Sequence, residues 1–280
     1  MKIRLLPLIA LFLCHPLHGA LQAAEPPLRV VASTTLIEGI VAAVGGNRVT
    51  ASAVIPYAMC PGHFDLSPRT ATSIAEADLF LQHGFEAFAR GLTFADDGPR
   101  RVVLSVAGNG MIPAVHRQIV ESVVDALCAA RPADTAIFKA NAAAYDQQIG
   151  QAEEAVQDAR ATLAGVPVLA AVMNTPFVEW TGCKVIDTFP RDEGLSARAL
   201  GRLLQQGRQA DVRLIVDNQQ SLGRTGRKLA EELGVPLIVL SNFPPVENGG
   251  YPAALQTSLS TLTDALPQTP AEPQGRRDQN

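Results

Sequence analysis

Short runs of β-branched residues alternate with helical patterns along most of this 280-residue chain. Strand composition is found first in LRVVAST, RVTASAVI, DLFLQHGFE and RRVVLSV. The alternation returns after residue 165 with PVLAAVM, CKVIDTF, VRLIVDN and PLIVLSN. Strands separated by helices form parallel sheets, because each helix carries the chain back to the same edge. The sequence therefore predicts an α/β fold of two lobes, each with a mostly parallel sheet flanked by helices.

A long helical pattern separates the two series of strands. No proline interrupts residues 134–163, and apolar residues recur there at near-heptad spacing. A helix of roughly 30 residues spans about 45 Å, which is long for a helix inside one compact domain. We expect a stiff connecting helix at 134–164, between an N-terminal lobe at 25–133 and a C-terminal lobe at 165–266. A cleft for a ligand would lie between the lobes.

The two ends of the chain have a different character. The first 24 residues combine Lys2 and Arg4 with a short apolar run and then small residues, which is typical of a secretory signal peptide. The apolar run is too short for a transmembrane helix, which needs roughly 20 residues. The polar, proline-rich residues 267–280 are typical of a disordered tail. We therefore expect a soluble protein exported to the periplasm.

The charge of the chain limits its partners. The formal net charge is -4, and no basic patch stands out. This composition argues against a nucleic-acid partner. We expect a monomer that takes a small ligand.

Candidate ligand-binding residues lie at the ends of the strands. In open α/β sheets, ligands bind beyond the carboxyl ends of the strands. In the first lobe this rule selects Met59, Cys60, His63, Asp65, His83, Asn109 and Met111. In the second lobe it selects Met173, Asn174, Asp217, Asn218, Gln219, Ser241 and Asn242.

The loop IPYAMCPGHFDLSP carries the densest group of these candidates. Pro61 and Gly62 fold the chain between Cys60 and His63, so a thiolate and an imidazole can contact one cation. Zinc and copper accept such a pair, and Asp65 could orient the imidazole. The alternative is a turn in which Cys60 is buried or forms a disulfide, for which Cys183 is the candidate partner.

Other candidates allow more than one interpretation. His83 follows a strand at the same edge of the lobe. It could be a metal ligand or a hydrogen-bonded structural residue. Asp217 could be an oxygen ligand or could cap its loop. Thioethers favour Cu(I), although methionine also fills irregular gaps in proteins. The methionines at the strand ends are Met59, Met111 and Met173.

A catalytic function is a further alternative. Cys60 could serve a thiol-dependent enzyme or a redox protein. However, Cys60 and His63 share one turn, which poorly suits a base aligned with a thiolate. The chain also contains no G-x-S-x-G and no H-E-x-x-H motif. We therefore expect a binding protein rather than an enzyme.

Taken together, these features resemble the zinc/manganese-type substrate-binding proteins of ABC importers. The resemblance covers nearly the whole mature chain. It is strongest in VVASTTLIEGIVAAVGGNRV, PGHFDLSPRTATSIAEADLFLQHGFE and LAEELGVPLIVL. It implies a metal ion held between the lobes by two ligands from each, and delivery of that ion to a membrane permease driven by an ATPase.

The resemblance also assigns ligand positions, and most of them depart from the family pattern. His63 matches the first histidine ligand. The second histidine position falls at Gly108 or Asn109, the third ligand at or beside Asn174, and the acidic fourth ligand at Ser241 or Asn242. The family's histidine-rich acidic loop is missing. Neutral amides are weak ligands for zinc, so the usual metal site is not retained.

Two hypotheses for the ligand follow from these departures. The metal site could have moved to Cys60, His63 and His83 from the first lobe with Asp217 from the second, a set that suits zinc. A ligand set that includes Met59, Met111 or Met173 would favour Cu(I). Manganese or another divalent metal is a further alternative for the bound ion. Alternatively, the cleft could hold a chelated metal or a small polar molecule through Asn174, Asn218, Gln219 and Asn242.

Overall fold

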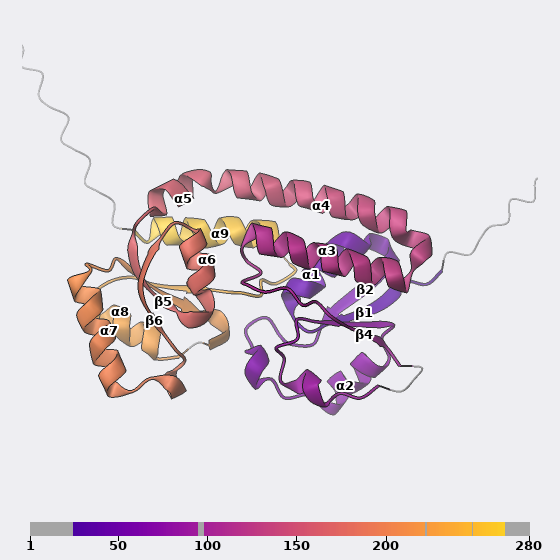
Figure 1. Ribbon diagram of the computed structural model, residues 1–280, viewed down its shortest axis with the longest axis horizontal. Helices are drawn as coiled ribbons and strands as arrows, with labels where there is room; N and C mark the ends of the chain where they lie inside the picture. The colour runs from indigo at the N-terminus through magenta and orange to yellow at the C-terminus, as the bar shows by residue number, and fades with distance from the viewer. Residues whose placement is uncertain (1–24, 95–97, 222, 248, 267–280) are drawn as a thin grey trace, which may run out of the picture.

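The structure is a computed structural model that describes residues 25–94, 98–221, 223–247 and 249–266. Within these residues the chain forms two four-stranded sheets, and all strand pairs in both sheets are parallel. Figure 1 shows them as two lobes beneath long helices. The predicted two-lobe α/β architecture is confirmed. The predicted signal peptide and tail lie outside the described residues.

The first sheet has the strand order β2-β1-β3-β4. Thr34 caps α1, and Ser67 caps α2 with Pro68 in its first turn. The strands of this lobe are β1 (Leu28–Ala32), β2 (Val49–Ala53), β3 (Leu79–Gln82) and β4 (Arg100–Val103). Its helices are α1 (Thr35–Gly45), α2 (Pro68–Ala75) and α3 (Pro113–Ala130).

The second sheet has the order β6-β5-β7-β8 and so repeats the topology of the first. Ser196 caps α7. The strands are β5 (Pro167–Ala171), β6 (Lys184–Phe189), β7 (Leu214–Asn218) and β8 (Leu237–Leu240). The helices are α6 (Thr175–Trp180), α7 (Ala197–Gln209) and α8 (Thr225–Leu233).

The shared topology determines where a ligand would bind. In each sheet the strand order reverses beside the first strand, between β1 and β3 and between β5 and β7. A crevice opens at such a switch point, outside the carboxyl ends of the strands. Single 3-10 turns shape several of these ends: η2 (Pro61–His63), η5 (Val172–Asn174), η6 (Asp192–Gly194) and η7 (Gln219–Ser221).

The connecting helix is divided in two. α4 (Thr135–Ala155) and α5 (Gln157–Leu163) meet at Val156, whose φ of -101° and ψ of 5° interrupt the helix. Val156 at the break and Leu163 at the end of α5 are both buried in the core. The last helix, α9 (Gly250–Asp264), lies alongside α4 and α5 (Figure 1).

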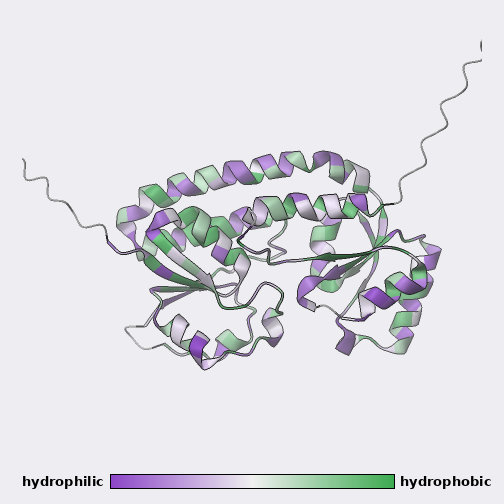
Figure 2. Ribbon diagram, turned by 180° about the vertical axis from the view of Figure 1, so that it is seen from behind, coloured by the Kyte–Doolittle hydropathy of each residue, from purple (hydrophilic) through white to green (hydrophobic). Residues whose placement is uncertain are grey.

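One hydrophobic core runs through both lobes. It joins Val30 of β1 to Val216 of β7 through Ile149 of α4 and Leu255 of α9. Figure 2 shows apolar residues along the strands and alternating polar and apolar residues on the long helices. No helix among the described residues combines the length and the apolar character needed to cross a membrane. The shared core therefore holds the two strand-end edges in a defined relation.

Candidate functional site

The centre of the interlobe contact is a pair of buried amides. Asn109, in the loop between β4 and α3, donates through Nδ2 to Asn242 Oδ1 at 2.8 Å and to the Met173 carbonyl at 3.1 Å. Asn242 Nδ2 donates to the same carbonyl at 3.0 Å. Both side chains are buried. These contacts join the first lobe to the ends of β5 and β8 in the second.

A second contact between the lobes is made by Gln220 in η7. Its Nε2 donates to the Tyr57 carbonyl of the first lobe and to Ser241 Oγ, each at 2.8 Å. Its Oε1 accepts from the Asn242 backbone at 3.2 Å. Gln219, which the sequence analysis selected, is only half-buried beside it. The direction of the 3-10 turn decides which of the two glutamines faces the cleft.

Asn174 and Asn218 extend the network within the second lobe. Asn174 Nδ2 donates to the Asp217 carbonyl at 2.9 Å and, more weakly, to the Leu240 carbonyl at 3.4 Å. Asn218 donates to Asn174 Oδ1 and accepts from the Gln220 backbone at 2.9 Å. Both asparagines are fully buried. Their polar groups are therefore used to hold the strand ends of this lobe together.

His63 lies exposed in η2 and faces the other lobe. Arg191 Nη1, from the loop after β6, is 3.1 Å from His63 Nδ1. Because a guanidinium only donates, Nδ1 accepts this hydrogen bond and its lone pair is occupied. Arg191 was not selected from the sequence, although it follows a strand and the same strand-end rule would have found it.

The other candidate side chains of the histidine loop, residues 55–68, differ in exposure. Cys60 is half-buried at the start of the turn, and Asp65 is exposed. Cys60, Cys128 and Cys183 are all free thiols, so the alternative of a Cys60–Cys183 disulfide is not realised. Cys183 is buried beside Thr181 in the second lobe, and burial raises the pKa of its thiol.

His83 makes structural contacts at the end of β3. Its Nε2 is 2.9 Å from Thr34 Oγ1, and its ring stacks on Phe85 with centroids 4.9 Å apart. The buried Glu86 carboxylate accepts from the His83 and Gly84 backbones at 2.9 Å and 2.7 Å and from Ser33 Oγ. Burial lowers the pKa of His83 to about 4, against an opposing effect of Glu86. The imidazole is therefore neutral at pH 7.

Asp217 lies at the end of β7 and is buried. Its Oδ1 accepts from the Asn218 backbone at 2.7 Å, and its carboxylate packs against Gly226 at the start of α8. Burial raises the pKa of Asp217, and the negative charge of Asp192 adds to the increase. The side chain is thus used inside the second lobe.

The methionines differ in their accessibility. Met59 and Met173 are 49% and 62% exposed, at the ends of β2 and β5, whereas Met111 is fully buried in the core. Tyr57, Phe85 and Val172 are also large exposed apolar side chains at strand ends. Two thioethers are therefore accessible to solvent, one in each lobe, and the third is not.

The predicted ligand set does not assemble in this structure. Within the described ranges, no group of three or more His, Cys, Asp or Glu side chains lies close enough to hold a metal ion. Cys60 and His63 share a turn, but His83 and Asp217 are held by contacts of their own. The ends of the strands instead bring the side-chain amides of Asn109, Asn174, Asn218, Gln220 and Asn242 into one hydrogen-bonded region.

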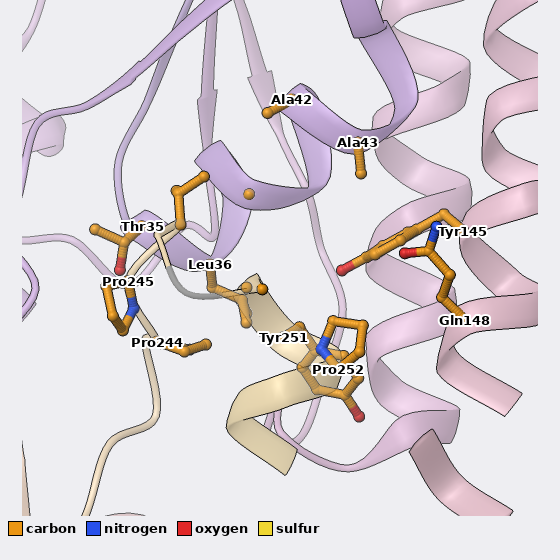
Figure 3. Close-up of a pocket in the computed structure, with 14 residues that line it drawn as sticks. Thr35, Leu36, Ala42, Ala43, Tyr145, Gln148, Pro244, Pro245, Tyr251 and Pro252 are labelled. Carbon is orange, nitrogen blue, oxygen red and sulfur yellow. The ribbon is translucent and has the colours of Figure 1, made fainter. Parts of the chain in front are cut away.

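A separate pocket of about 240 Å³ lies between α1, α4 and the beginning of α9 (Figure 3). Tyr145 and Gln148 come from α4, while Pro244 and Pro245 come from the loop before α9. None of the residues selected from the sequence lines it. The pocket is therefore distinct from the strand-end region.

The comparisons with known proteins identify the family. The family model described as ZnuA, "Zinc-uptake complex component A periplasmic", matches residues 30–265. The chain belongs to this family. Its members are periplasmic metal-binding proteins of ABC importers, and they are binding proteins rather than enzymes. A search of the curated proteins finds no match.

Solved structures of the ZnuA family and related proteins have the same fold. A ZnuA deletion mutant with zinc bound is 14% identical, with a TM-score of 0.75 over 87% of this chain and 100% of that chain. A manganese-bound periplasmic metal-binding protein mutant from Candidatus Liberibacter asiaticus is 17% identical (TM-score 0.71; 85% and 98%). A mutant of the laminin-binding adhesin of Streptococcus agalactiae is also 17% identical (TM-score 0.74; 86% and 100%).

Family membership gives the amide network its significance. The resemblance places the second, third and fourth metal ligands at Asn109, Asn174 and Asn242 or their neighbours. Asn109 and Asn242 are in direct contact, and Asn174 belongs to the adjoining network. This ZnuA-family chain thus has hydrogen-bonded amides at or beside the positions to which the resemblance assigns metal ligands.

Proposed function

We propose that this chain is the periplasmic receptor of an ABC importer for a transition metal, with zinc as the first cargo to test. Family membership supports the class of function. The observation that carries the proposal to this chain is His63, a family ligand position with a metal-binding side chain, exposed and facing the opposite lobe. Delivery of the ion to a membrane permease follows from the family and is part of the proposal.

Cys60 and His63 are the first contacts in the proposed site. They share the turn η2, so one ion can approach the thiolate and the imidazole together. His83 and Asp217 complete the proposed set only after rearrangement. His83 must release Thr34, and Asp217 must turn away from α8. Asp65, exposed on the same loop, can orient His63 once Arg191 has moved.

Cu(I) is a second candidate cargo, favoured by one specific observation. Met59 and Met173 keep exposed thioethers at the strand ends of the two lobes, and Met59 precedes Cys60 directly. Thioether and thiolate ligands select Cu(I) over harder cations. Met111 is excluded from this set because it is fully buried. Manganese prefers oxygen ligands, and Asp65 carries the one carboxylate of this loop.

A chelated metal or a small polar molecule is less well supported. The amides that would recognise it donate to, and accept from, groups of the protein itself. Such a ligand would have to break these hydrogen bonds and form its own with the same amides, with no net loss of hydrogen-bond free energy. A monomeric state remains an expectation from the sequence.

Elemental analysis of the exported, untagged protein tests the proposal. We expect close to one zinc or copper ion per chain in the wild type, and loss of that metal in His63→Ala. Glu76→Ala is the control, because it removes an exposed acidic side chain of the same lobe outside the histidine loop. Absence of metal from the wild type, or equal metal in His63→Ala and the wild type, would reject the metal site.

Methionine variants separate the two cargoes. Met59→Leu and Met173→Leu should weaken Cu(I) binding about tenfold and leave zinc binding unchanged, because leucine keeps the volume but removes the thioether. Met111→Leu is the matched control, since Met111 is buried. Equal Cu(I) affinity in all three variants would reject the copper alternative.

A further inference from the structure

Direct hydrogen bonds cross between the lobes at the strand ends. Asn109 of the first lobe donates to Asn242 and to the Met173 carbonyl, and Gln220 of the second lobe donates to the Tyr57 carbonyl. We call this set of groups the interlobe clasp. Its three amide side chains are buried, and hydrogen bonds within the second lobe support Gln220 and Asn242.

Additional contacts surround the clasp. Thr35 Oγ1 at the start of α1 donates to the Phe243 carbonyl at 2.9 Å. The ring of His83 lies 5.8 Å from that of Phe243, between centroids. Together with the His63–Arg191 contact, these interactions add further pairs of groups that join the two lobes.

The chemistry of the clasp is complementary without an ion. Histidine and carboxylate side chains that ligate one ion direct their lone pairs at that ion rather than at each other. An amide carries both a donor and an acceptor. Asn109 Nδ2–H therefore donates to the side-chain oxygen Oδ1 of Asn242, and this 2.8 Å hydrogen bond is favourable without an ion.

We propose that the interlobe clasp holds the two lobes closed in the absence of cargo. Cargo would then enter at the exposed rim, where His63 and Met173 lie, and would not drive closure of the cleft. This inference concerns the regulation of the proposed receptor and rests on that function for its biological meaning. A receptor of this kind would present a closed form to its permease whether or not cargo is bound.

Two isosteric substitutions test the clasp. Asn109→Asp keeps the oxygen that accepts from the Met111 backbone, but it places a carboxylate against the Asn242 and Met173 oxygens. Asn174→Asp is the matched control, because Asn174 also donates two hydrogen bonds through Nδ2, both within the second lobe. Gln220→Glu is a second test variant, which loses the bond to Tyr57.

The measurement is the distance between the lobes in the mature protein. Spin labels on unnatural amino acids at the exposed Arg69 of α2 and Arg198 of α7 leave the native thiols intact. We expect one short distance in the metal-free wild type, unchanged by zinc or Cu(I). Loss of two net hydrogen bonds should multiply the open population in Asn109→Asp by about 5- to 150-fold. Asn174→Asp should stay closed.

Each outcome has a defined meaning. A metal-free wild type that is open and closes on addition of zinc or Cu(I) would overturn the clasp. An Asn109→Asp protein with the same interlobe distances as Asn174→Asp would also overturn it. If Asn109→Asp does not fold, the same comparison is made with Gln220→Glu. Elemental analysis of the same samples tests the cargo separately. Closed lobes with no bound metal would reject the proposed function and leave the clasp standing.

Discussion

At the scale of single residues, Arg191 controls the availability of His63. The imidazole can bind a cation only through a free lone pair, and Arg191 occupies the one on Nδ1. The guanidinium charge also repels an incoming cation. Neither effect is visible in the histidine loop alone, because Arg191 lies 128 positions further along the chain.

This contact leads to a prediction for metal affinity. Arg191→Met should raise the affinity of the protein for zinc about three- to tenfold, because Nδ1 becomes free and a positive charge is removed. Arg202→Met is the control: it removes the same charge from the same lobe, where Arg202 pairs with Asp187. Isothermal titration with zinc measures both. Equal affinities for the two variants would show that Arg191 does not restrict His63.

The burial and direction of single side chains also decide which candidate ligand-binding residues can contact a ligand or the opposite lobe. Met111 and Met173 both follow strands, yet one is fully buried and the other is 62% exposed. Gln219 and Gln220 are adjacent, and only Gln220 reaches across the cleft. Sequence alone could select these positions but could not choose between them, because the choice depends on the direction of a loop.

At the scale of elements, the fit of α8 against β7 explains the role of Asp217. Gly226 in the first turn of α8 has no Cβ, and one added there would overlap the Asp217 carboxylate. Asp192 accepts hydrogen bonds from the Arg224 and Thr225 backbones at the same helix start. Asp217 is therefore part of the packing between a strand and a helix.

A pair of glycine substitutions tests this interpretation. Gly226→Ala should lower the free energy of unfolding by about 1–3 kcal/mol, because the new methyl group overpacks against Asp217. Gly201→Ala, in α7 where space is open, should instead raise it by about 0.5–1 kcal/mol. Urea denaturation at pH 7 measures both. If Gly226→Ala is as stable as Gly201→Ala, Asp217 is free to move, and its role as a ligand gains support.

At the scale of the whole molecule, a buried polar cluster ties the long helices together. His116 of α3 donates through Nδ1 to the Gly110 carbonyl at 3.1 Å and accepts from Tyr145 of α4 at 3.0 Å. Its ring stacks on Tyr251 of α9 with centroids 3.5 Å apart. Tyr251 in turn donates to the Met111 carbonyl at 3.0 Å. The cluster links α3 of the first lobe to α4 and α9.

The cluster predicts how stability depends on pH. Burial lowers the pKa of His116 from 6.5 to about 3, so the folded protein keeps it neutral while the unfolded chain takes up a proton below pH 6.5. This contribution is complete above pH 6.5 and is lost as the pH falls toward 3. Between pH 7 and pH 5 the loss should be about 2 kcal/mol of unfolding free energy.

His116→Gln isolates this effect. The variant cannot titrate in this range, so its unfolding free energy should fall by about 2 kcal/mol less than that of the wild type between pH 7 and pH 5. Urea denaturation at the two pH values gives the difference. An equal decrease in both proteins would mean that His116 is not the group responsible.

The sequence by itself determined the architecture of this protein. Two series of strands and helices, the caps at Ser67 and Ser196, and the long helical stretch before residue 165 follow from local periodicity and capping, which depend on near neighbours in the chain. The family resemblance was likewise present in contiguous segments. The sequence did not show the break of the connecting helix at Val156, a residue whose side chain is buried in the shared core.

Only the tertiary structure decided which strand-end groups meet. The contact between Asn109 and Asn242 joins residues 133 positions apart, and the Gln220–Tyr57 contact joins residues 163 positions apart. The same packing separates His83 and Asp217 from His63 by giving each its own hydrogen-bond partners. A hydrogen bond depends on distances of about 3 Å and on direction, and these are defined only once two lobes are packed on one core.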